Sequence, residues 1–392
     1  MTSTLVTARK TREFWRHASL GEHVDILSGF AFDSKLFSDS KGVPLIRIRD
    51  VVRGRTETRY TGNYDSRFVA QTGDLLIGMD GDFNRALWSS EPALLNQRVC
   101  KVTANAKSLD QGYLYHFLPG ALLDIWQQTP FATVKHLSVR GIRAISIPLP
   151  PLEEQRRIAA ILDKADELRA KRRQAIARLD ALTQSIFHSM FGDTVSNSLN
   201  WPVKAFGRVT TSRLGKMLDK KAQTGKHGFK YLRNANVQWF QINTDDLLEM
   251  DFSPSDQIEF ALRRGDILVC EGGEPGRAAI WKDQATDCYF QKALHRVRPN
   301  PDDLDPQYIV HLLWALAHGG GLKDHVTVAT IAHLTGEKLK RMHIPVPPLE
   351  LQQTFANRIA AVERLKETHR KHLAELDALF ASLQSRAFKG EL

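Results

Sequence analysis

Residues Ile147-Pro-Leu-Pro-Pro-Leu-Glu-Glu-Gln155 form a motif on which the whole architecture depends, because it returns 197 positions later as Ile344-Pro-Val-Pro-Pro-Leu-Glu-Leu-Gln352. The same offset carries Leu179-Asp-Ala-Leu182 onto Leu376-Asp-Ala-Leu379 without a gap. Self-similarity at a fixed period is the mark of an internal repeat. We therefore predict a tandem duplication whose unit is about half of the chain.

The halves also match upstream of this motif, with an offset that changes by a few residues, as loops of unequal length would cause. Tyr113-Leu-Tyr-His116 corresponds to Tyr308-Ile-Val-His311, and Gly73-Asp-Leu-Leu-Ile77 corresponds to Gly265-Asp-Ile-Leu-Val269. Short apolar runs that follow a turn are typical of strands. We read Pro44-Leu-Ile-Arg-Ile-Arg in the same way, so each unit should begin with a mixed α/β part.

Each copy of the motif leads into a long predicted helix. The paired prolines can occupy the first helical positions, where a missing N–H costs nothing, and Gly192 is a suitable stop for the first helix. Apolar residues then recur in alternating steps of three and four, which is the 3.5-residue repeat of a coiled-coil seam. The predicted seam consists of Ile158, Ile161, Leu168, Leu179, Leu182 and Ile186 in the first copy and Phe355, Val362, Leu365, Leu376, Leu379 and Leu383 in the second.

Polar residues interrupt this seam, at Arg172 and His369 in equivalent places and again at Arg358. Two interpretations stay open, since a polar seam residue can fix the register or can bend out of a loose seam into water. Neither predicted helix contains an interior proline or glycine, and each should be ~60 Å long at ~1.5 Å per residue. If the seams pair with each other, the second helix must run back antiparallel, with an approximate two-fold axis across the middle.

We therefore predict an α+β fold with two mixed α/β domains, separated by two long helices that pair as an antiparallel coiled coil. The expected boundaries are 1–149 for the first domain, 150–192 for a central spacer helix, 193–346 for the second domain and 347–392 for a C-terminal spacer helix.

Composition limits the possible functions. The 392 residues include 54 Lys+Arg against 44 Asp+Glu, a formal net charge of +10, which favours a polyanionic partner. Three cysteines without a CxxC pair exclude a disulfide framework and a thiolate metal site. No apolar run reaches the ~18 residues that span a bilayer, and the first residues lack the apolar stretch of a secretory signal. We expect a cytoplasmic protein with no membrane partner.

The sequence shows no catalytic constellation. It has no Gly-x-Gly-x-x-Gly after a strand and no Gly-x-x-x-x-Gly-Lys phosphate loop, and its 14 histidines include no HExxH or His/Cys cluster with the spacing of metal ligands. It also lacks the Asn-Pro-Pro-Tyr type of tetrapeptide that holds an amino group in base methylation. Asp80, Asp82 and Glu271 could be ligands of a nuclease metal, but no lysine follows at the spacing such sites use, so polar loops are the favoured interpretation. We expect no metal or cofactor in this chain.

Polar residues that suit DNA binding follow the Gly-Asp strands. Arginine and lysine read guanine edges, while asparagine and glutamine read adenine, and phosphate contacts come from basic clusters. The candidates for base contacts are Asn84, Arg85, Asn96, Gln97, Arg98, Arg277, Gln291 and Lys292. The candidates for phosphate contacts are Arg47, Arg49, Arg53, Arg55, Lys216, Lys220, Lys221, Lys226 and Lys230.

The duplicated motif, each time leading into a long helix, resembles the DNA specificity (S) subunit of type I restriction–modification systems, and the resemblance covers essentially the whole chain. Tyr231-Leu-Arg-Asn-Ala-Asn-Val237 is similar to that family's target-recognition domains, which adds Arg233, Asn234 and Asn236 to the candidate DNA-binding residues. The first copy departs from this pattern at Leu45-Ile-Arg-Ile-Arg-Asp-Val51, so transfer of residue roles is weaker there.

The resemblance implies that each target-recognition domain reads one half of a bipartite, asymmetric site in double-stranded DNA, while the paired helices set the unread gap. It implies two modification subunits, which bind S-adenosylmethionine and methylate adenine N6, and restriction subunits that use ATP and Mg. Because the two domains share scaffold residues but differ in their loops, we predict unlike half-sites. Two other functions stay open: an enzyme in its own right, such as a nuclease or methyltransferase, and a structural coiled-coil adaptor whose domains bind protein.

Overall fold

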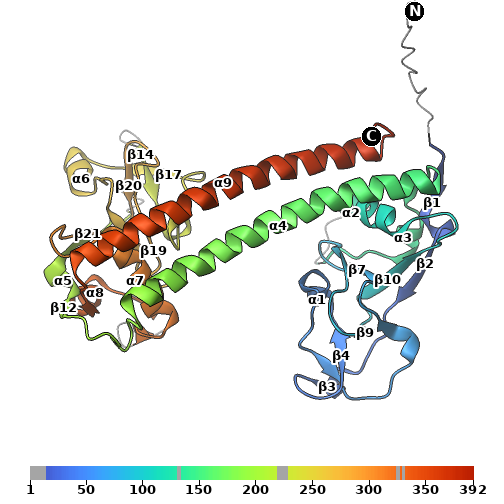
Figure 1. The fold of residues 1–392 in the computed structure, drawn as a ribbon, viewed down its shortest axis with the longest axis horizontal. Helices are drawn as coiled ribbons and strands as arrows, with labels where there is room; N and C mark the ends of the chain where they lie inside the picture. Colours follow the sequence, from blue (N-terminus) through green and yellow to red (C-terminus); the bar gives the residue numbers. More distant parts are fainter. Residues whose placement is uncertain (1–14, 130–133, 219–227, 324–326, 329–331) are drawn as a thin grey trace, which may run out of the picture. The chain divides into compact units, whose positions relative to one another are not determined.

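The computed structural model describes residues 15–129, 134–218, 228–323, 327–328 and 332–392 (Figure 1). The chain divides into two compact units, one comprising the chain up to Arg173 together with Lys371–Leu392 and the other comprising Gln174–Arg370. Each long helix therefore contributes one end to each unit, whereas the predicted boundaries separated the helices from the domains. We describe each unit by itself.

The first unit contains a four-stranded antiparallel sheet in the order β2 (Val24–Ser28), β10 (Val99–Ala104), β7 (Leu75–Gly78) and β8 (Arg85–Leu87). Its apolar side chains pack against helix α2 (Gln111–Gln128) and against the first turns of the long helix α4 (Leu152–Phe191). A short strand β1 (His17–Ser19) pairs with β11 (Ser146–Pro148), and helix α3 (Val139–Arg143) precedes β11.

A second sheet of this unit has the order β3-β5-β4-β9-β6, with β4 and β9 parallel. The strands are β3 (Phe37–Ser38), β5 (Arg59–Tyr60), β4 (Val43–Ile46), β9 (Ala93–Leu95) and β6 (Val69–Ala70). The predicted strand at Pro44 is too long, because helix α1 (Ile48–Arg53) begins directly after it. The Asp50 carboxylate accepts a hydrogen bond from the Arg47 backbone N–H at 2.9 Å and so caps the start of α1.

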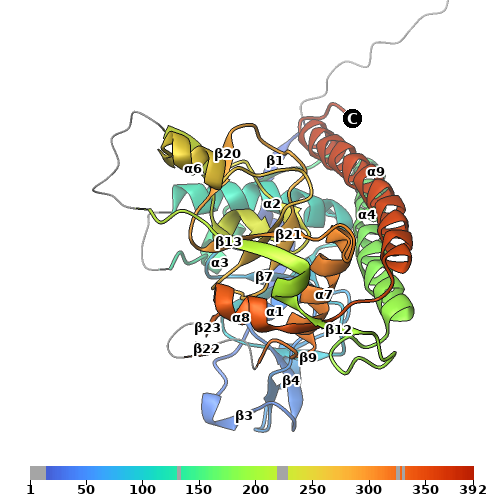
Figure 2. The same ribbon diagram turned by 90° about the vertical axis from the view of Figure 1, so that its left-hand side faces the viewer.

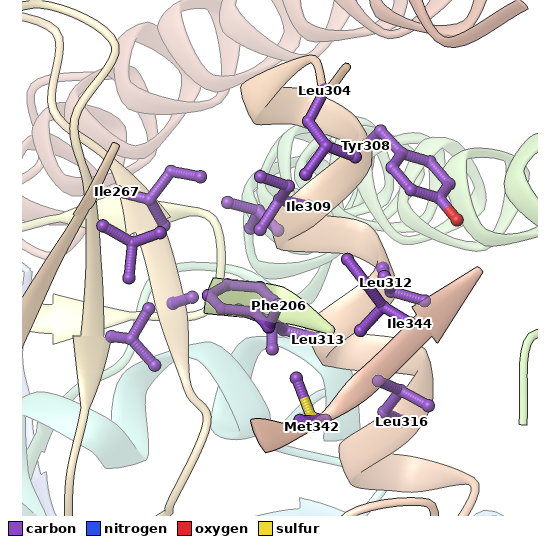
Figure 3. Close-up of a cluster of buried hydrophobic side chains, with 14 of the residues drawn as sticks. Phe206, Ile267, Leu304, Tyr308, Ile309, Leu312, Leu313, Leu316, Met342 and Ile344 are labelled. Atoms are coloured by element: carbon purple, nitrogen blue, oxygen red, sulfur yellow. The ribbon is translucent and has the colours of Figure 1, made fainter. Parts of the chain in front are cut away.

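The second unit repeats the first sheet with the same strand order: β13 (Thr210–Leu214), β21 (Leu294–Pro299), β18 (Ile267–Cys270) and β19 (Ala278–Ile280). Helix α7 (Pro306–His318) covers this sheet, and Figure 3 shows its Ile309 and Leu313, with Leu304 just before the helix, beside Ile267 and Phe206. The duplication that the sequence predicts is therefore present in the fold.

The remaining elements of the second unit follow the same plan. Strand β14 (Gly228–Leu232) lies between antiparallel β17 (Leu248–Asp251) and parallel β20 (Cys288–Phe290). Strand β12 (Val203–Ala205) pairs with β24 (His343–Pro345), as β1 does with β11 in the first unit. The short helices are α5 (Phe206–Val209), α6 (Pro254–Glu259) and α8 (Gly336–Arg341), and the small hairpins are β15 (Val237–Gln238) with β16 (Gln241–Ile242) and β22 (Thr327–Val328) with β23 (Ala332–His333).

The two long helices are α4 and α9 (Leu349–Ala387), and each begins directly after its Pro-Pro pair. The stop predicted for α4 is confirmed, since Gly192 follows the helix with a φ of +72°. Within each unit a segment of α4 packs antiparallel to a segment of α9: Arg169 faces Asp377 in the first unit, and Asp180 faces Lys366 in the second. Figures 1 and 2 draw the two helices as neighbours.

The packed face of these helices differs from the predicted seam at four positions. Leu168, Leu182, Leu365 and Leu379 are 41%, 45%, 55% and 49% exposed, whereas the other eight predicted seam residues are buried or half-buried. At each of these four places the next residue along the chain is the more covered one, namely Arg169, Thr183, Lys366 or Phe380. The packed stripe keeps steps of three and four residues but is displaced around each helix from the predicted seam.

Candidate nucleic-acid interface

The clearest candidate surface of the first unit is the turn at residues 96–98, between β9 and β10. The Val99 N–H donates to the Asn96 carbonyl at 2.9 Å, which closes the turn and leaves Gln97 and Arg98 exposed. Gly29 passes so close that a Cβ there would clash with the Asn96 carbonyl. The chain at the end of β2 therefore packs against this turn. A loop that positions polar side chains for binding needs such a rigid support.

A loop that starts at Asp80 lies beside this turn and orients its arginine. The Asp80 carboxylate contacts the Arg98 Nε at 3.3 Å and the His136 Nδ1 at 2.6 Å. Asn84, in the same loop, is exposed. One carboxylate thus holds an exposed guanidinium next to an imidazole and free amides, which is the set of donors and acceptors that base edges and phosphates can use.

The second unit builds the same surface from equivalent elements. The turn at residues 291–293 joins β20 to β21, and the Leu294 N–H donates to the Gln291 carbonyl at 2.9 Å. Gly215 takes the place of Gly29, since a Cβ there would clash with the Gln291 carbonyl. Lys292 is exposed at the position where the first unit has Gln97. The two turns therefore share a scaffold and differ in the side chains they present.

Two arginines predicted to read bases are half-buried and make contacts inside their units, and their base-reading role stays a prediction. The Arg85 guanidinium lies 3.5 Å above the Tyr115 ring, and burial lowers its pKa from the ordinary value. Arg277 donates to the Asn234 carbonyl at 2.9 Å and pairs with Glu274 at 3.2 Å. Arg85 begins β8 and Arg277 directly precedes β19, so their side chains follow the alternation of the strands rather than the surface of a loop.

The segment that resembles target-recognition domains is likewise structural at its centre. Asn236 is fully buried, and its amide donates to the Asp246 carboxylate at 2.7 Å. Arg233 pairs with the same Asp246 at 2.7 Å, and the Asn234 amide donates to the Gly272 carbonyl at 2.9 Å. These residues hold the short helix η4 (Asn234–Asn236) against its neighbours. Full burial corrects the prediction that Asn236 contacts DNA, whereas Arg233 and Asn234 are half-buried and stay predicted DNA-binding residues.

The other predicted residues fall into three groups. The exposed residues are Arg49, Arg53, Arg55, Asn84, Gln97, Arg98, Lys230 and Lys292. The half-buried residues are Arg47, Asn96, Gln291 and Lys216, the last in an ion pair with Asp256. Lys220, Lys221 and Lys226 lie outside the described residues.

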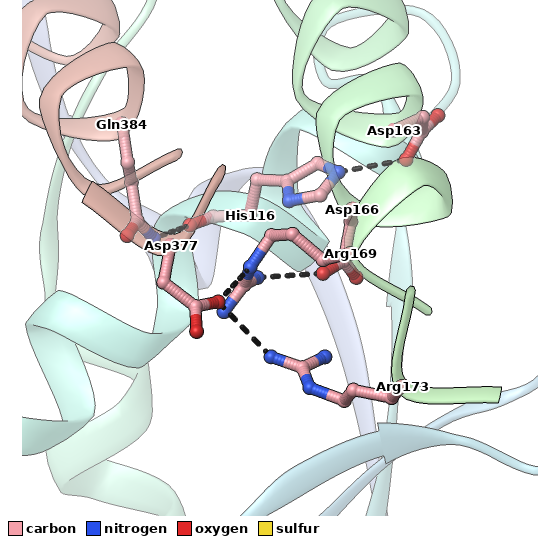
Figure 4. A network of polar contacts seen from close by, with 7 residues as sticks. All are labelled: His116, Asp163, Asp166, Arg169, Arg173, Asp377 and Gln384. Atoms are coloured by element: carbon pink, nitrogen blue, oxygen red, sulfur yellow. Dashed lines mark hydrogen bonds and ion pairs between the residues drawn. The ribbon is translucent and has the colours of Figure 1, made fainter. Parts of the chain in front are cut away.

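A pair of charge clusters between α4 and α9 was missed by the sequence analysis. In the first unit Arg169 contacts Asp377 of α9 at 2.6 Å and Asp166 of its own helix at 2.7 Å (Figure 4). In the second unit Lys366 contacts Asp180 of α4 at 2.7 Å and Glu363 of its own helix at 2.5 Å. The repeat offset relates each member of one cluster to a member of the other, so comparison of the two copies for paired charges would have found them.

The described residues contain no cluster of three or more His, Cys, Asp and Glu side chains that could bind a metal ion. Cys100, Cys270 and Cys288 are buried, and burial raises the pKa of Cys100 and of Cys288 to about 12. In the part of the chain that the structure describes, no helix combines the length and the apolar character needed to cross a membrane.

Comparison with known proteins gives one consistent result. The family model for the type I restriction modification DNA specificity domain matches twice, at residues 13–178 and 199–378. The EcoBI specificity subunit of Escherichia coli is 30% identical over 409 residues, which cover 96% of this chain and 86% of that protein. The MjaVIII specificity subunit of Methanocaldococcus jannaschii is 21% identical and covers 97% and 93%. The crystal structure of an S subunit from M. genitalium has a TM-score of 0.56 at 14% identity, covering 95% of this chain and 96% of that one.

Proposed function

Because the chain belongs to the family of type I restriction–modification DNA specificity subunits, we propose that each of its two units reads one half of a bipartite, asymmetric site in double-stranded DNA. The chain itself carries out no chemistry. The paired helices α4 and α9 act as an antiparallel coiled coil that sets the unread gap between the half-sites, with an approximate two-fold relation between the copies.

The turns at residues 96–98 and 291–293 are the observation that carries this proposal. Equivalent strands and an equivalent glycine support both turns, yet one presents Gln97 and Arg98 while the other presents Lys292. A common scaffold with different donors and acceptors reads different base sequences. Unlike half-sites follow directly, so the target should not be palindromic.

The exposed leucines support a second part of the proposal, the assembly with partner subunits. Leu168 and Leu182 of α4 are exposed, and so are their repeat equivalents Leu365 and Leu379 of α9. An apolar side chain that recurs on both copies suits two identical partners. We assign these positions to the docking of two methyltransferase subunits, which would supply S-adenosylmethionine and adenine-N6 chemistry, while restriction subunits would supply the ATP- and Mg-dependent steps.

The decisive experiment is to express the chain with its methyltransferase subunit in a restriction-deficient host and to map methylated adenines across the genome. We expect one bipartite motif with unlike half-sites and one gap length. A palindromic motif would contradict the assignment of unlike half-sites. If the methylated motif were the same without this chain, it would not be the specificity determinant.

The two rival functions have their own outcomes. Cleavage or methylation of DNA by the purified chain alone would establish an enzyme. A structural adaptor predicts that the assembled methyltransferase binds DNA no better with the chain than without it. A DNA reader instead predicts a gel shift whose affinity falls steeply as the salt concentration rises, because phosphate contacts release counterions.

A further inference from the structure

The glutamine that ends the repeated motif joins the globular part of each unit to its long helix. In the first unit Gln155 lies in the first turn of α4 and is buried. Its Oε1 accepts from the Asp110 backbone N–H at 2.8 Å, and its Nε2 donates to the Ser108 carbonyl at 3.1 Å and the Pro150 carbonyl at 2.8 Å. Since Asp110 caps the start of α2, one side chain links the loop before α2, the start of α2 and the entry into α4.

The second unit repeats this arrangement bond for bond. Gln352 is fully buried in the first turn of α9. Its Oε1 accepts from the Asp305 N–H at 2.9 Å, and its Nε2 donates to the Asp303 carbonyl at 2.9 Å and the Pro347 carbonyl at 2.8 Å. Asp305 caps α7, the equivalent of α2.

A buried tyrosine reinforces the same joint in both units. The Tyr113 hydroxyl donates to the Pro148 carbonyl at 2.9 Å, and the Tyr308 hydroxyl donates to the Pro345 carbonyl at 2.8 Å. These tyrosines hold the strand that leads into each Pro-Pro pair, while the glutamines hold the helix that follows. Hydrogen bonds therefore connect the globular part of each unit to the chain both before and after the Pro-Pro pair.

We propose that Gln155 and Gln352 are positioning residues, which fix the orientation of each recognition domain on its long helix and thereby the number of base pairs between the half-sites. This inference rests on the proposed function. Two of the three hydrogen bonds of each glutamine cross from the long helix to the loop before α2 or α7, and the third fixes the turn at the prolines. Two bonds across the joint restrict rotation about it more than a single bond would. A rotation that broke these bonds would leave the buried glutamine amide and its backbone partners unsatisfied, so the joint favours one orientation.

A small rotation at this joint is large on the scale of DNA. An arm of roughly 25 Å, about twice the radius of gyration of a 100-residue domain, moves its end by about 4 Å for a rotation of about 10°. Successive base pairs are ~3.4 Å apart along the duplex. Loss of the joint should therefore let a domain reach a half-site that lies one base pair nearer or farther.

The test uses Gln155→Met and Gln352→Met in the full chain with its methyltransferase, followed by genome-wide mapping of methylated adenines. We expect both half-site sequences to stay the same, while the fraction of methylation at gaps one base pair shorter or longer rises at least tenfold. Gln111→Met is the matched control. It also removes a glutamine with two backbone partners, Ala104 and Val102, but neither lies on α4, so its gap distribution should remain that of the parent chain.

Hydrogen exchange at single-amide resolution shows whether the joint has opened. The Asp110 amide should exchange faster in Gln155→Met and the Ala104 amide faster in Gln111→Met. Faster exchange at Asp110 with an unchanged gap distribution would overturn the inference. If Gln155→Met does not fold, Gln155→Asn, whose amide is one methylene shorter, takes the same test, and failure of both to fold would show a role in folding rather than in positioning. Failure of the proposed function is distinguishable, because the parent chain would then give no bipartite motif at all.

Discussion

The charge clusters between α4 and α9 allow a quantitative prediction for the variants Asp377→Asn and Asp180→Asn. Each variant removes the carboxylate that reaches across from the other helix, while Arg169 keeps Asp166 and Lys366 keeps Glu363. The cations are mostly covered, with side chains 18% and 8% exposed, whereas Asp377 and Asp180 are 43% and 57% exposed. The size of the effect therefore depends on how far water screens the carboxylates.

Two unit charges ~4 Å apart attract by about 4 kcal/mol at an effective dielectric constant of about 20. Fully exposed pairs contribute about 0–1 kcal/mol, and hydrogen bonds to charged groups contribute about 1.5–3 kcal/mol. For half-exposed carboxylates on covered cations we expect a loss of about 1–1.5 kcal/mol in the free energy of unfolding for each variant. In units of this size such a loss lowers Tm by about 2–6 °C.

The same clusters favour the observed register of the two helices over registers that are shifted by one or two helical turns. An advance of eleven residues along α4, from Arg169 to Asp180, matches a retreat of eleven along α9, from Asp377 to Lys366. A shift of three, four or seven residues would place opposite Arg169 one of Ala374, Phe380, Leu373, Ala381, Arg370 and Gln384. It would place opposite Lys366 one of Ala177, Thr183, Ile176, Gln184, Arg173 and Phe187. None of these is an acid.

The assay is thermal unfolding followed by circular dichroism, together with double-mutant cycles that combine Asp377→Asn with Arg169→Met and Asp180→Asn with Lys366→Met. The cycle isolates the pairwise energy across the helices. Glu167→Gln with Glu367→Gln is the matched control for the variant that combines Asp377→Asn with Asp180→Asn. It makes the same change of net charge, but it removes ion pairs within one helix only. A coupling energy near zero, or an equal fall in Tm for the control, would show that these pairs do not hold the helices together.

Three further results are expected. Arg98→Ala should weaken DNA binding by the methyltransferase complex and reduce its salt dependence if the guanidinium contacts phosphate, or relax the specificity for one half-site if it contacts a base. Lys292→Ala should have the same effect at the other half-site. Gel shifts measure the binding and its salt dependence, and methylation maps measure the specificity. Burial lowers the pKa of His311 to about 4, below the ~6.5 of an unfolded chain, so stability should fall as pH drops from 6.5 towards 4, and His311→Gln should flatten this dependence of Tm on pH. Leu168→Ser with Leu365→Ser should lower Tm only slightly, since the side chains are 41% and 55% exposed, but should reduce co-purification of the methyltransferase subunit; retained co-purification would contradict their assignment to docking.

Much of the fold follows from local patterns. The repeat of Ile147–Gln155 revealed the duplication, and the runs after Gly73 and Gly265 became the central strands β7 and β18. The Pro-Pro pairs and Gly192 also mark where the long helices begin and where α4 ends, although the prolines precede the helices and do not occupy their first positions. Proline and glycine act through the backbone of their own residues. Such features need no knowledge of what the chain packs against.

The candidate site was predicted less completely, because a loop arginine looks the same in a sequence whether it points outward or inward. Arg98 is exposed on its turn, whereas Arg85 stacks on Tyr115 and Arg277 bonds to the backbone of Asn234. Tyr115 is remote from Arg85 in the chain and Asn234 is remote from Arg277, so only the arrangement of the strands brings them together.

The spacer helices show which features the sequence determines and which depend on tertiary packing. Periodicity and the Pro-Pro pairs were enough to define two long helices with an apolar stripe and a common repeat. Which residues of that stripe are covered was decided by packing, which covers Arg169 more than Leu168 and Lys366 more than Leu365. Secondary structure depends on neighbours along the chain, but burial and charge pairing depend on groups that are adjacent only after the chain has folded.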